Sequence, residues 1–248
     1  MRRINKNHAV WFIILLMLSF YIFYLCITGT LERFVHPRMF TYIYVALGVL
    51  MVMAAFQATR IPEGGGERIK RGYVVFLLPL VCGMLFHPGS LNEDISKSKG
   101  VVISPNQADL EYGGQSYVEG AVINGIITLT ENNFTKVLYS IWSNPDQYVG
   151  RKIAVTGFTY KNEAMAANQL IISRMVINCC AADTILVGLA AQLNGENKIH
   201  QNDWIKVMGT IAMMRCINPL TSEEETVPGI MVESLENIEK PENPYVYP

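Results

Sequence analysis

The sequence predicts a two-part protein, an α-helical transmembrane anchor followed by an all-β domain. Half of the 248 residues are hydrophobic and only 17% are charged, which is an apolar balance for a chain of this size. The excess is concentrated in three long apolar runs within residues 9–88, whereas later residues alternate between apolar and polar. Alternation of that kind has the period of β-strands. We therefore expect a membrane domain over 1–88, a linker over 89–114 and a β-rich domain over 115–248.

Two of the apolar runs have the length of a membrane-spanning helix. Residues 9–27 carry no charge, and a helix of that length measures about 28 Å, close to the thickness of the hydrocarbon layer. We predict one span over about 9–28 and another over 39–58, which begins just after Pro37. A cleaved signal peptide is the alternative for the first run, with Arg2, Arg3 and Lys6 as its basic segment, but no small-residue cleavage site follows.

The third run, 73–88, is shorter and contains Pro79 and Gly83, so a kinked span competes with a re-entrant segment. We predict a span. Lysine and arginine favour the cytoplasmic side, and they gather at the N-terminus and in the connection 59–72. Three crossings then make a multi-pass protein of the plasma membrane and place the C-terminal domain outside the cytoplasm. The runs contain no Asp, Glu, Lys or Arg, which favours an anchor over a transport path.

The outer domain shows a hairpin, a helix and then strands. Asn124-Gly125 is a turn signal within 118–130, and Asn133 is placed to cap a helix that ends at Asn144-Pro145. Five segments have strand patterns: 152–160, 169–178, 185–193, 204–212 and 229–238. Gly157 and Gly209 lie in mid-strand, where glycine permits a bulge or sharp coiling. We predict a small five-stranded OB-like β-barrel preceded by a short helix, with a β-sandwich as the alternative.

The sharpest local motif is the pair Cys179-Cys180 followed by Asp183, at the end of a predicted strand. Thiolates and a carboxylate can hold a soft metal ion such as zinc, with Cys216 or His200 as possible further ligands. Disulfide or thiol chemistry is a second interpretation, because we expect an oxidising compartment. Buried structural thiols are a third.

Composition and missing motifs also argue against two classes of function, nucleic-acid binding and catalysis. A net charge of −1 and the lack of a basic stripe argue against nucleic acid. The aromatic and basic residues in and beside the first strand segment are Phe158, Tyr160, Lys152 and Arg151. Packing within the domain explains them more simply than stacking against nucleic-acid bases. Neither a phosphate-binding glycine loop nor a nucleophile elbow is present, so we expect no enzyme and no certain cofactor.

Several segments resemble the YcgQ-like family of bacterial membrane proteins. They are RFVHPR (33–38), NPDQYVGRKIAVTGFTY (144–160), RMVINCCAADT (174–184), WIKVMGT (204–210) and the ending PENPYVYP. The family motif includes Cys179, Cys180 and Asp183, whereas Cys216 and His200 lie outside it, and residues 194–199 match loosely. The resemblance implies N-terminal spans, an outer β-domain and, as partner, a polytopic permease of the arsenical type encoded by a neighbouring gene.

Together these observations predict an accessory membrane subunit of a permease, whose helices lie in the lipid bilayer and whose outer domain serves transport or the handling of substrate or metal. A stand-alone, membrane-tethered module that binds or senses metal through its thiols is one alternative. A structural protein of the cell envelope is another.

Overall fold

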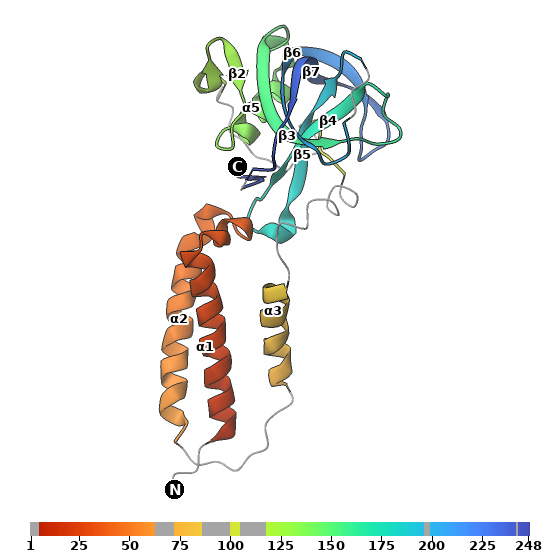
Figure 1. The fold of residues 1–248 in the computed structure, drawn as a ribbon. Coiled ribbons are helices and arrows are strands. Elements are labelled where there is room, and N and C mark those ends of the chain that lie inside the picture. Colours follow the sequence, from red (N-terminus) through yellow and green to blue (C-terminus); the bar gives the residue numbers. More distant parts are fainter. Residues whose placement is uncertain (1–4, 63–71, 86–99, 105–117, 196–198, 242) are drawn as a thin grey trace. The chain divides into compact units, whose positions relative to one another are not determined.

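A computed structural model of the chain describes residues 5–62, 72–85, 100–104, 118–195, 199–241 and 243–248. The chain divides into two compact units, residues 1–90 and 91–248; helices α1 to α3 belong to the first, and strands β1 to β8 to the second (Figure 1). Most of the predicted linker lies outside the described residues. Its residues 100–104 are described, and they are not an exposed connector: Val101, Val102 and Ile103 are buried in the β-rich unit, where Val102 bridges Val187.

Helices α1 (Lys6–Ile27) and α2 (Phe40–Arg60) form an antiparallel pair. The N–H of Asn5, before α1, donates to the carbonyl of Ile61, after α2, over 3.0 Å. Gln57 near the end of α2 hydrogen-bonds the ring of His8 near the start of α1. Two short 3-10 helices, η1 (Thr30–Arg33) and η2 (Pro37–Met39), make the connection. Contacts between opposite ends of the two helices require that they run in opposite directions.

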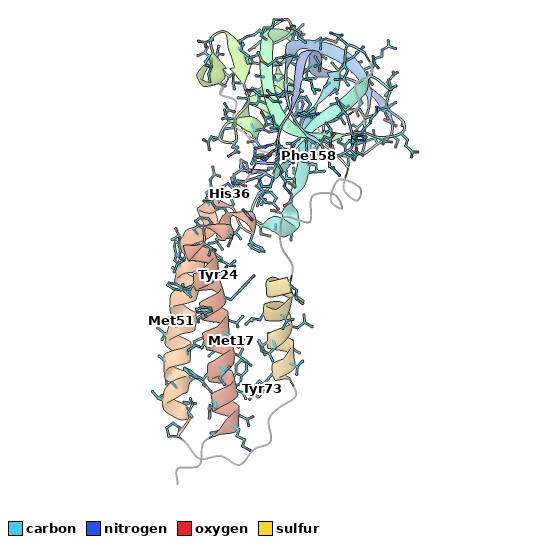
Figure 2. The ribbon with its side chains drawn as sticks, viewed as in Figure 1. Met17, Tyr24, His36, Met51, Tyr73 and Phe158 are labelled. Atoms are coloured by element: carbon cyan, nitrogen blue, oxygen red, sulfur yellow. The ribbon has the colours of Figure 1, made fainter. Side chains whose placement is uncertain are left out.

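Both helices are long and apolar enough to cross a membrane. They carry large apolar side chains on their outer surfaces, among them Tyr24 and Met51 (Figure 2), which are 55% and 60% exposed. An apolar surface that continues along two helices is costly in water. We conclude that this unit associates the chain with a membrane.

Helix α3 (Tyr73–Leu85) lies parallel to α1. Near the start of both helices, the Trp11 ring contacts Tyr73 and Phe76 edge-on, with centroids 5.3 and 5.0 Å apart. Near their ends, the Tyr21 hydroxyl donates to the Gly83 carbonyl over 2.9 Å. A Cβ atom at position 83 would lie 2.7 Å from that hydroxyl oxygen, so glycine is what allows the close approach. Residues 86–88 of the predicted third span lie outside the described residues.

The β-rich unit contains one hydrogen-bonded sheet in the order β1-β2-β3-β6-β7-β5-β4-β8, and a further pairing of β3 with β4 joins its central strands into a ring (Figure 1). The ring strands are β3 (Lys152–Tyr160), β4 (Gln169–Val176), β5 (Ile185–Gln192), β6 (Trp204–Ile217) and β7 (Glu224–Asn237). These are the five segments predicted from the sequence. Neighbouring strands are antiparallel except β5 and β7, which are parallel.

Three short strands extend the ring. The turn at Asn124-Gly125, where both residues have positive φ, joins β1 (Val122–Ile123) to β2 (Ile126–Thr128), and β2 pairs in parallel with β3. The predicted hairpin is therefore present. Strand β8 (Tyr245–Val246) pairs in parallel with the end of β4 and was not predicted, because two residues next to prolines carry no alternation.

The β6–β7 hairpin is longer than its sequence pattern suggested. The acidic residues Glu224 and Glu225, at the start of β7, pair with Ile217 and Cys216 of β6. A tight turn over 218–222, with Ser222 at φ +60°, brings the two strands into register. Glu224 is exposed on the strand. Acidic residues in a row show no apolar–polar alternation, so the sequence pattern did not indicate this part of β7.

Helix α5 (Phe134–Ser143) is the short helix predicted before the ring strands, and its buried apolar side chains join the core of the ring. Asn133 stands at its N-cap, but its side chain does not cap the helix: it accepts from the Thr130 N–H and donates to the Thr128 carbonyl. Those two bonds instead hold the segment that leads from β2 into the helix. An asparagine side chain can bond either the N–H groups of the helix that follows or the backbone that precedes it, and the sequence alone does not distinguish the two.

Glycines permit the close contacts of the ring. At Gly209, where the β6–β7 register shifts, a Cβ atom would lie 2.2 Å from the Met231 carbonyl oxygen. At Gly157 it would lie 2.6 Å from the Ser173 carbonyl oxygen, close to the point where β3 changes partner from β6 to β4. Both roles agree with the predicted bulge or coiling.

Candidate functional site

The Cys179-Cys180 pair lies on the connection between β4 and β5. Strand β4 ends at Val176, a 3-10 turn η7 covers Ala181–Asp183, and β5 begins at Ile185. Ile177, two residues before Cys179, is held by another strand: its N–H donates to the Val246 carbonyl of β8 over 3.1 Å. The thiols therefore stand on a short turn with a paired strand on each side. We call residues 178–184 the thiol turn.

The Asp183 carboxylate organises this turn. One of its oxygens accepts from the Cys179 N–H over 2.8 Å and the other from the Cys180 N–H over 3.1 Å. Cys180 and Asp183 together form the capping box of η7. As a result the two sulfur atoms and a carboxylate oxygen all lie within 4.8 Å of one another. Cys179 is exposed, and the other two are half-buried.

These contacts shift the titration of the cluster. The hydrogen bond to Asp183, then the one to Cys180, with smaller effects of burial and of both charges, raise the pKa of the Cys179 thiol to about 11. Burial raises the pKa of the Asp183 carboxyl, but hydrogen bonds from the Cys179 thiol and from backbone N–H groups outweigh it and hold that pKa below its usual value. At neutral pH the turn thus holds a carboxylate beside a protonated thiol.

The other two candidate ligands do not join the cluster. Among the described residues, the group of close ligand atoms consists of Cys179, Cys180 and Asp183 alone. Cys216 is 2% exposed, in the cluster of buried residues that also contains Phe158 and Trp204, with its sulfur near the Ile217 carbonyl. Burial, with the charge of Glu225, raises the pKa of its thiol to about 11. The His200 N–H donates to Asp203, and its carbonyl accepts from Thr159. Both have structural roles here.

The aromatic and basic residues of β3 are also engaged within the unit. Phe158 and Tyr160 are buried (Figure 2 labels Phe158), and Phe158 contacts Trp204 with ring centroids 5.6 Å apart. Lys152 pairs with Glu233. The interpretation of these residues as packing elements agrees with this arrangement.

One charged residue escaped the sequence analysis. Arg174 lies on β4 with only 3% of its side chain exposed, 3.5 Å from Glu131 and with its guanidinium 5.1 Å from the centroid of Trp204. Its Nε and Nη1 atoms have no hydrogen-bond partner among the described residues, and burial lowers its pKa while Glu131 partly restores it. A single arginine inside an otherwise apolar strand segment was the signal for it.

The helices, the ring of strands and the thiol turn define a class: a membrane-associated protein with a mostly β domain. Sequence comparison adds the family. The DUF1980 N-terminal domain matches residues 10–102, and the DUF1980 C-terminal domain matches residues 109–248. The chain belongs to the DUF1980 family, which confirms the resemblance to the YcgQ-like proteins.

Two relatives place it further. The chain is 27% identical to UPF0703 protein YcgQ of Bacillus subtilis over 282 residues, covering 95% of this chain and 98% of the relative. It is 29% identical over 124 residues to a Streptococcus mutans protein named "Putative two-component membrane permease complex subunit". That match covers 50% of this chain and 44% of the relative.

Proposed function

We propose that the chain is an accessory subunit of a permease, held in the membrane by its helices and acting through its β-rich domain rather than by catalysis. The observation that carries this proposal is the helical unit, whose described apolar stretches, 9–27, 40–59 and 73–85, contain no Asp, Glu, Lys or Arg. A protein that moves ions or polar substrates by itself places such groups at membrane depth. The name of the Streptococcus mutans relative supports a permease partner.

The direction of the helices supports an extracytoplasmic position for the β-rich unit. Because α3 runs parallel to α1, with Trp11 beside Tyr73 and Tyr21 beside Gly83, we propose that it crosses the membrane in the same direction. The basic N-terminus and the connection 61–72 then share the cytoplasmic side, and the chain leaves α3 on the opposite side. At 13 residues, α3 measures about 20 Å as described.

We further propose that the ring of β3 to β7 is an OB-like barrel. Taken in chain order, the first strand of the ring pairs with the second and the fourth, and the third and fifth pair in parallel. Barrels of this kind use their surface and loops for binding. The fold by itself does not select a ligand.

The test is partner capture from the native membrane by the full-length chain. A Cβ atom at Gly48 of α2 would meet nothing within 4 Å, whereas Ala54 on the same helix is 7% exposed. A photo-crosslinking residue at position 48 should link to a multi-pass permease that also co-purifies in mild detergent. The same residue at position 54, which faces the protein interior, should link to that permease much less.

Purification of the chain as a stable species without a permease, with no link from position 48 beyond lipid or itself, would contradict the proposal. It would favour the tethered sensing module or the envelope protein. The orientation has a separate test: a reporter fused after Pro248 should be active outside the cytoplasm. Cytoplasmic activity of that reporter would refute the three-crossing arrangement.

A further inference from the structure

Two thiols and a carboxylate converge on the exposed turn between β4 and β5. We propose that the thiol turn binds one Zn²⁺ ion exchangeably, with Cys179 and Cys180 as thiolate ligands and Asp183 as a monodentate carboxylate ligand. This site goes beyond the permease assignment and does not depend on it.

The distances fit a zinc ion after small side-chain rotations. Zinc–sulfur bonds of about 2.3 Å and zinc–oxygen bonds of about 2.1 Å place tetrahedral ligand atoms roughly 3.4–3.8 Å apart. The three candidate atoms already lie within 4.8 Å of one another. Cys179 is exposed and Cys180 half-buried, so their side chains can turn about χ1 without repacking the core. The backbone of the turn can stay where it is.

The turn is organised before any ion arrives. The backbone N–H groups of Cys179 and Cys180 hold the Asp183 carboxylate, one on each oxygen. The Asn178 N–H also donates to this carboxylate. An ionised carboxylate has about four lone-pair positions, so three backbone donors leave one for a metal, which suits a monodentate ligand. Hydrogen bonds of this kind to ligating groups fix their orientation and support affinity. The paired strands on both sides limit the entropy lost on binding.

The donor set selects the metal and the type of site. Copper(I) prefers soft sulfur donors throughout, whereas zinc accepts thiolate and carboxylate together. Structural zinc sites are closed by four protein ligands, but among the described residues only these three come together. One position therefore remains open to water or an exchanging ligand. That is the arrangement expected of a site that takes up and releases its ion.

Binding converts two thiols into thiolates. Each sulfur loses its proton to solvent as its bond to zinc forms, so that one Zn²⁺ is bound and two protons are released, with no change of oxidation state. The thiol proton that Cys179 shares with Asp183 is replaced by the metal between the same two groups. Affinity should accordingly rise with pH.

The experiment uses full-length protein in mild detergent, reduced and freed of metal with a chelator that is then removed. Zinc is titrated in competition with a chromophoric chelator, and Co²⁺ is added separately to detect thiolate-to-metal charge-transfer absorption. We expect one zinc per chain and that absorption band. Cys179→Ser and Cys180→Ser should each weaken zinc binding about 100-fold or more and remove most of the band.

Serine suits both positions, because it is nearly isosteric and keeps the capping function of residue 180. Cys216→Ser is the matched control: its thiol is buried elsewhere, so zinc affinity should not change. The proposal is overturned if the reduced wild type binds no stoichiometric zinc, if either serine variant at 179 or 180 binds as the wild type does, or if Cys216→Ser alone abolishes binding. Circular dichroism of each variant establishes that it is folded.

Discussion

Replacing Gly209 by alanine tests how closely strands β6 and β7 approach each other at the register shift of the ring. A Cβ atom there would lie 2.2 Å from the Met231 carbonyl oxygen and 2.7 Å from the Ile230 methyl carbon Cγ2. Observed Cβ contacts are essentially never shorter than 3.0 Å. The nearest obstacle is backbone, which cannot rotate away as a side chain end can. The strands must therefore separate locally.

The cost of Gly209→Ala follows from these contacts. Overpacking a well-packed interior costs about 1–3 kcal/mol, and weakening a ladder hydrogen bond beside the shift adds about 1 kcal/mol. Alanine stiffens the unfolded chain, which returns about 0.4–1 kcal/mol. We expect a net loss of about 2–3 kcal/mol in the free energy of unfolding. For a unit of this size that lowers Tm by roughly 5–10 °C.

Thermal unfolding of the full-length chain in detergent, followed by circular dichroism, measures the effect. Gly120→Ala is the matched control, since a Cβ atom there meets nothing within 4 Å, and it should change the stability by less than about 0.5 kcal/mol. If Gly209→Ala unfolds at the same temperature as the wild type and the control, the close approach of β6 and β7 does not exist as described.

Three further changes test other parts of the structure. Glu131→Gln removes the charge paired with buried Arg174 and should lower the free energy of unfolding by about 1–2 kcal/mol, less than for a fully buried pair because Glu131 is half exposed. In an Arg174→Met background, chemical denaturation should show no further loss of stability from Glu131→Gln. An equal loss in that background would show that the two residues are not coupled. Gly83→Val places a side chain against Tyr21, so disulfide trapping between cysteines introduced at positions 11 and 76 should fall several-fold, whereas unchanged trapping would refute the α1–α3 contact. Because burial and Glu225 raise the pKa of Cys216 to about 11, its alkylation should stay slow at pH 7–8 and accelerate as pH rises or as the protein unfolds; fast modification of the folded protein at pH 7, read by mass spectrometry, would contradict its burial.

Much of the candidate site could be found from the sequence, because adjacent cysteines and an aspartate three residues on are rare and visible by inspection. Their convergence could not. It depends on the carboxylate of Asp183 turning back to the N–H groups of Cys179 and Cys180, which only a defined turn conformation allows. Cys216 shows the reverse case: it matched the chemistry, but its strand position directs the thiol into the core.

Elements with a local signal can be predicted from the amino-acid sequence. Uninterrupted apolar length indicates α1 and α2, and Asn124-Gly125 indicates a turn. Apolar–polar alternation or, for β4, a continuous β-prone run indicates the ring strands. How these elements meet is visible only in the folded chain: α3 runs parallel to α1, β3 pairs with β4 to join the ring, and β8 pairs with β4. Those features depend on contacts between residues distant in the chain, such as Tyr21 and Gly83. Periodicity describes one segment's faces and does not specify which distant segment will cover them.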